Sequence, residues 1–82
     1  MLEAAQIRAA RALLGLGQGQ LSDLAGVGLR TVKRIELSDD VSGSARTHWK
    51  IQTALEAAGV EFIPAEGGKG PGVRLRQDPR DG

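Results

Sequence analysis

The connection between two helix-type segments is the feature that most restricts the fold of this 82-residue chain. Residues 17–26 and 28–37 both carry apolar side chains at helical spacing, and they meet at the tripeptide Gly26-Val27-Gly28. So short a connection does not suit antiparallel neighbours and predicts two helices that cross steeply. We expect Gly26 to make the sharp turn, because glycine adopts positive φ freely, and Val27 to point into the core.

Two further helices and a hairpin are predicted around this pair. Apolar spacing predicts a first helix over residues 2–15 and a fourth over residues 45–59, whereas VEFI and GVRLR are short β-type runs joined by turn formers. The predicted fold class is mainly α, with a four-helix domain over residues 1–59, a C-terminal β-hairpin over 60–76 and a flexible tail over 77–82. In the second helix we expect Leu21, Leu24 and Ala25 to face inward.

The third helix has one apolar and one basic side. At about 100° per residue from Leu29, Val32 and Ile35 lie near 300° and 240°. Arg30, Lys33 and Arg34 cluster near 90°, opposite the apolar side. A solvated surface helix would have the same pattern, but combined with the tight turn it favours a helix that enters the major groove of DNA.

Composition excludes several other kinds of site. The chain has no cysteine and a single histidine, His48, so neither a thiolate metal site nor a Ser/His/Asp triad with good geometry is expected. The glycine-rich run at residues 15–19 follows a helix rather than a strand, which argues against a nucleotide cradle. No apolar run is long enough to span a membrane. We therefore expect a cytoplasmic protein that is not an enzyme, with no metal and no cofactor.

The segment QGQLSDLAGVGLRTVKRIE resembles the helix-turn-helix of the Cro/Xre family of phage-repressor-like transcriptional regulators. The similarity extends over residues 6–63. It implies a Cro/Xre-like helix-turn-helix domain that binds double-stranded DNA sequence-specifically as a homodimeric repressor, without a small-molecule substrate. It also implies that an ion pair between Arg11 and Glu36 orients the third helix, and that Gln18 contacts a phosphate and braces that helix.

The remaining DNA-binding positions follow from the same resemblance. Arg30 or Lys33 would donate to guanine O6 and N7, and Leu29 would either touch a thymine methyl group or belong to the core. The expected DNA-binding residues are Gln18, Gly28, Leu29, Arg30, Thr31, Lys33, Arg34 and Arg46.

Two features depart from the family pattern. Gly28 stands where serine or threonine usually caps the third helix, and Asp39 and Asp40 lie in a loop where relatives often hold phosphates with basic residues. The acidic loop and the net charge of only +1 favour an alternative. In it the fold is kept, but the chain is a protein-interaction module that binds a protein partner, as an antiactivator or an antitoxin-like protein.

Trp49 falls well off the apolar stripe of the fourth helix, at about 160° from Ile51. Three surroundings are open for it: coverage by the hairpin, a subunit contact, or simple exposure. An isolated hairpin is marginally stable, and its free edges could pair with a second copy. The residues expected at a homodimer interface are Trp49, Phe62, Val73 and Leu75.

Overall fold

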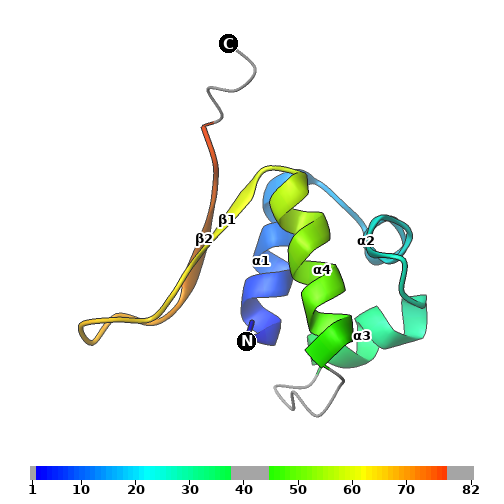
Figure 1. Cartoon of the computed structure of the whole chain (residues 1–82), viewed down its shortest axis with the longest axis horizontal. Coiled ribbons are helices and arrows are strands. Elements are labelled where there is room, and N and C mark those ends of the chain that lie inside the picture. The colour runs from blue at the N-terminus through cyan, green and yellow to red at the C-terminus, as the bar shows by residue number, and fades with distance from the viewer. Residues whose placement is uncertain (1, 38–44, 78–82) are drawn as a thin grey trace.

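The computed structural model describes residues 2–37 and 45–77, which form four helices and a two-stranded antiparallel sheet (Figure 1). The elements are α1 (Ala4–Leu14), α2 (Gln18–Ala25), α3 (Leu29–Leu37), α4 (Ala45–Ala57), β1 (Val60–Ile63) and β2 (Gly72–Leu75). The mainly α layout with a C-terminal hairpin is confirmed. Asp39, Asp40 and all of the predicted tail except residue 77 lie outside the described residues.

One hydrophobic core joins all the helices to the first strand. The largest fully buried side chains come from α1, α2, α3, α4 and β1: they are Ile7, Leu21, Val32, Ile51, Leu55 and Val60. α2 packs against α3 and α4, and α3 also packs against α1. The sheet lies beside α1 and α4, with β2 against α1 and β1 against α4 (Figure 1). The core therefore fixes α3 from one side only.

The buried side of α2 differs from the prediction at Leu24. Leu21 is fully buried and Ala25 is half-buried, as expected, but Leu24 is 56% exposed and Ser22 is buried in its place. Leu21, Ala25 and Ser22 span about 100° of the helix, and Leu24 lies about 60° outside that arc. The hydroxyl of Ser22 donates to the Gly19 carbonyl at 2.8 Å, so its burial leaves no unpaired polar group.

The turn between α2 and α3 has the predicted geometry. Gly26 has φ +68°, in the left-handed region that side chains disfavour. The amide of Val27 then donates to the Ser22 carbonyl at 3.1 Å, and its half-buried side chain packs against the core. A single glycine thus sets the angle at which α3 leaves α2.

The hairpin presents two different faces. In its register Val60 pairs with Leu75 and Phe62 with Val73, and these four side chains share the core-facing side because directly opposite residues point the same way. On the outer face Arg74 makes two hydrogen bonds to Glu61, at 3.0 and 2.9 Å, which lower the pKa of that carboxyl. The outer face therefore carries a charged pair, next to the half-buried Ile63.

One buried amide ties the hairpin to α1. The side-chain Nε2 of Gln6 donates to the Gly72 carbonyl at 3.1 Å, and its Oε1 accepts from the Glu3 amide at 3.0 Å. Gln6 is only 7% exposed, so both of its hydrogen bonds are shielded from water. The same side chain caps the first turn of α1 and holds the first residue of β2.

Two glycines of α2 and its turn should respond oppositely to alanine. Gly19 lies inside α2 with open space where a methyl group would be added, so Gly19→Ala should raise the free energy of unfolding by about 0.5–1 kcal/mol. Gly26→Ala should lower it by about 1 kcal/mol, because φ +68° is strained for alanine. Urea denaturation followed by circular dichroism measures both changes. A gain of stability in Gly26→Ala would contradict the turn geometry.

Candidate nucleic-acid interface

The outer side of α3 carries three exposed cations. Arg30, Lys33 and Arg34 are all exposed, whereas Val32 and Ile35 on the opposite side are buried. Within residues 2–37 and 45–77 the ion pairs are Arg11–Glu36 and Arg74–Glu61. None of the three cations therefore forms a salt bridge with a described acidic side chain, and their charge is directed to solvent.

A buried carboxylate fixes the other side of α3. Glu36 is 3% exposed, and it accepts two hydrogen bonds from Arg11, at 3.0 and 2.9 Å. Gln18, the first residue of α2, donates to the same carboxylate at 3.1 Å. The hydrogen bonds with Glu36 raise the pKa of Arg11, so the guanidinium stays charged. The Arg11–Glu36 pair and the bracing contact of Gln18 that the family resemblance implies are both present.

The bracing network also reaches the backbone. Arg11 donates from its third nitrogen, Nη1, to the Leu16 carbonyl at 3.1 Å, and Arg8 donates to the carbonyl of Glu36. α1, the α1–α2 connection and the last turn of α3 are thereby joined. Because a charged hydrogen-bonded pair is sensitive to geometry, this network restricts rotation of α3 about its own axis.

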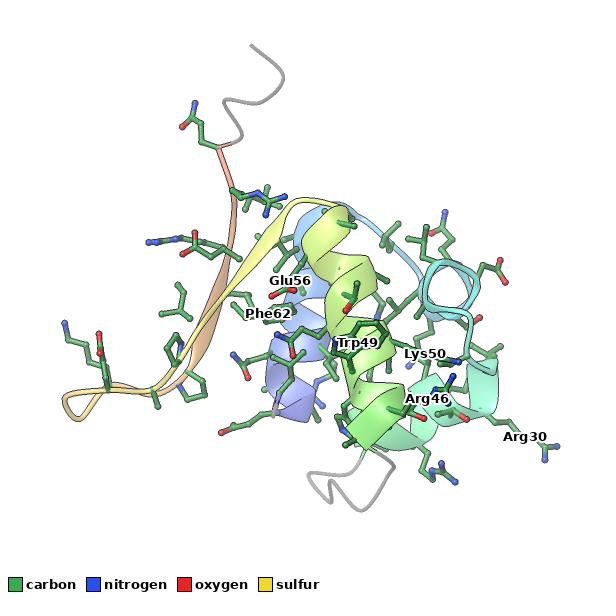
Figure 2. The ribbon with its side chains drawn as sticks, in the orientation of Figure 1. Arg30, Arg46, Trp49, Lys50, Glu56 and Phe62 are labelled. Atoms are coloured by element: carbon green, nitrogen blue, oxygen red, sulfur yellow. The ribbon has the colours of Figure 1, made fainter. Side chains whose placement is uncertain are left out.

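The other expected DNA-binding residues lie around α3. Leu29 is 41% exposed at the start of the helix, Gly28 directly before it is also exposed, and Thr31 is half-buried. Arg46 is exposed in the first turn of α4. Figure 2 shows Arg46 on the side of α4 that faces α3, while Arg30 extends away from the body of the molecule. Six of the expected positions thus lie on α3 or directly before it, and Arg46 and Gln18 lie in the first turns of α4 and α2.

The four residues expected at a dimer interface do not form one surface. Phe62 and Val73 are partly buried against the core, and Leu75 is 50% exposed at the end of β2. Trp49 is 64% exposed, so the interpretation that the hairpin covers it is wrong. Figure 2 shows Phe62 on the hairpin side of α4 and Trp49 across the front of that helix. Trp49 is separated from the hairpin because β1 follows the opposite flank of α4.

A shallow groove borders Trp49 between α2 and α4. It encloses about 250 Å³, and its lining residues are Leu24, Ala25, Trp49, Lys50, Thr53, Ala54 and Ala57. Leu24 and Lys50 are functional candidates that the sequence did not single out. In the sequence, Lys50 directly follows Trp49, which lies off the apolar stripe of its helix. Leu24 lies at the edge of the apolar stripe of α2.

The described part of the chain offers little support for a metal site or a membrane-spanning helix. Its histidine and acidic residues include no group of three that could hold a metal ion. His48 is buried, at 4% exposed, in the interior side of α4. In residues 2–37 and 45–77 no helix combines the length and apolar character needed to cross a membrane. The cationic side of α3 is therefore the candidate site with the clearest geometry.

No protein-family model matches the sequence, and no curated protein matches it.

Breaking the buried ion pair should cost far more stability than breaking the exposed one. The side chain of Glu36 is 2% exposed, and in Arg11→Met the side-chain partner left to its carboxylate is Gln18. This change should lower the free energy of unfolding by about 2 kcal/mol. Arg74→Met removes the equivalent two-hydrogen-bond pair with Glu61 at the surface and should leave stability nearly unchanged.

Urea denaturation of the two variants, measured side by side with the parent protein, checks this difference. Both changes remove one positive charge through the same substitution, so the overall charge effect cancels in the comparison. Equal losses in Arg11→Met and Arg74→Met would show that the bracing network does not hold α3.

Proposed function

We propose that this protein is a sequence-specific double-stranded DNA-binding regulator of the Cro/Xre type. In this proposal α2, the turn at Gly26 and α3 form the helix-turn-helix, and α3 enters the major groove. The observation that carries it is the row of exposed cations on α3, because the opposite side of that short helix is held by the core and by the Glu36 network. A braced helix with one basic side suits insertion between two phosphate backbones.

The proposed contacts are of two kinds: some read the bases, and others position the protein on the phosphates. Arg30 and Lys33 are proposed to donate to guanine O6 and N7, each good pair being worth about 1–3 kcal/mol of discrimination. Leu29, which is 41% exposed, is proposed to touch a thymine methyl group. Arg34, Arg46 and residues at the start of α2 and α3 are proposed to contact phosphates, which set affinity rather than sequence preference. The proposal requires no cofactor and no catalytic group.

The biological action that fits best is repression by occupation of an operator. A homodimer would place two α3 helices about one DNA turn apart, and it would then read a pseudo-palindromic site. The chain would act in the cytoplasm, where its DNA target lies.

A protein-interaction module is the second candidate, and the exposed Leu24 and Trp49 favour it. Large apolar side chains gathered on one surface are typical of protein contacts. In that function the chain would bind a different protein through this surface, and DNA would not be its target. Stoichiometric co-purification of a second protein, together with failure to bind DNA, would support this candidate over the first.

The DNA-binding proposal predicts a loss of affinity when the cations of α3 are removed. Fluorescence anisotropy with duplexes recovered by selection from random DNA should show specific binding that weakens as salt rises. Arg30→Ala/Lys33→Ala should reduce affinity for the selected duplex by about 100-fold or more, because it removes base contacts and charge together. It should also relax the preference for the selected sequence, because both side chains are proposed to read bases.

The matched control is Lys69→Ala/Arg76→Ala, which removes one lysine and one arginine from exposed positions in the hairpin region. It changes the net charge equally and should retain most of the affinity. Equal affinity of the α3 double variant and this control would overturn the assignment of α3 as the reading helix. Failure of the parent protein to select any sequence would overturn the proposed function.

A further inference from the structure

We propose that the groove between α2 and α4, centred on Leu24 and Trp49, is the surface at which a second copy of this chain binds around a two-fold axis. The dimer itself is a property of the protein alone. That this dimer aligns the α3 helices of its two copies on DNA rests on the proposed function.

Two large apolar side chains meet at this groove although neither belongs to the core. Trp49 is 64% exposed and Leu24 is 56% exposed, one on each side of a trough floored by small residues such as Ala25 and Ala54. Small residues between two large ones form a depression that the large side chains of a partner can fill. Tryptophan is also the residue type most enriched among the anchors of protein interfaces.

The charges around the groove favour a second copy over an unrelated partner. Lys50 lines the groove on α4, and Asp23 directly precedes Leu24 on α2. Neither side chain forms a salt bridge with a described residue, and Asp23 is exposed. In a two-fold contact whose axis follows the groove, the α2 of one copy meets the α4 of the other, so Asp23 and Lys50 form two equivalent opposite-charge pairs across one apolar centre.

The groove and the basic side of α3 face different directions. In Figure 2 Trp49 lies across the front of α4, whereas Arg30 extends sideways from the body of the molecule. A second copy seated on the groove therefore leaves Arg30 uncovered.

The surface of the chain is large enough for an interface of standard size. A standard interface takes about 800 Å² from each partner, or about 15% of the 5312 Å² accessible surface of this chain. The groove supplies the centre of such an area and the flanks of α2 and α4 supply its rim. We expect a monomer–dimer equilibrium in the micromolar range, which sedimentation can resolve.

Sedimentation equilibrium over micromolar concentrations tests the surface with alanine variants at exposed positions. Trp49→Ala and Leu24→Ala should each weaken the dimer by about 30-fold, as removal of an interface anchor does. Leu75→Ala is the matched control on the hairpin, where a leucine is similarly exposed, and it should leave the dimer intact. Circular dichroism verifies that each variant is folded.

Charge reversal identifies the partner as a second copy. Asp23→Lys and Lys50→Asp should each weaken self-association, and the combined variant should recover it, because the pair is then restored in the opposite sense. A parent protein that stays monomeric overturns the inference, as does loss of the dimer in Leu75→Ala or failure of the combined variant to recover. All these measurements are made without DNA, so their result does not depend on the proposed function. Failure of the proposed function would be seen separately, in the selection from random duplexes.

Discussion

The structure depends on how the Glu36 carboxylate is accommodated in the interior of a very small domain. A buried charge is expensive unless it is paired and fully hydrogen-bonded. Here Arg11 and Gln18 satisfy it from α1 and from the start of α2, so three elements must meet at one point. The chain could have placed a leucine at this position and packed as well. The hydrogen-bonded ion pair adds directional contacts, and these restrict the rotation of α3 more tightly than an apolar contact does.

The element order was predictable because local signals agree along the chain. Gly26 and the turn formers between residues 63 and 72 interrupt clear apolar periodicities, so the helices and strands fall where the spacing places them. The two faces of α3 were predictable for the same reason. Val32 and Ile35 lie on one side at helical spacing and are buried, whereas Leu29 and Leu37, at the two ends of the helix, are exposed.

The rest of the site depends on neighbours that the periodicity of one helix does not reveal. The exposure of Leu24 follows from α2 turning its small Ser22 inward against the adjoining helices. The helical angle of Trp49 showed that it lies off the stripe, but its surroundings depend on which flank of α4 the hairpin follows. That path is set by tertiary contacts. Spacing along a helix therefore predicted which way side chains point, and only packing decided what they meet.

The hydrogen bond from Gln6 to Gly72 links residues 66 positions apart. During synthesis, α1 leaves the ribosome long before β2 exists. Its polar side chain at Gln6 then stays hydrated, and the strand-facing flank of the helix stays open. The contact between Gln6 and β2 therefore forms only after that strand has emerged, and until then this flank of α1 lacks its partner. A chain halted before residue 72 would hold most of the core residues while exposing the α1 flank to other partners.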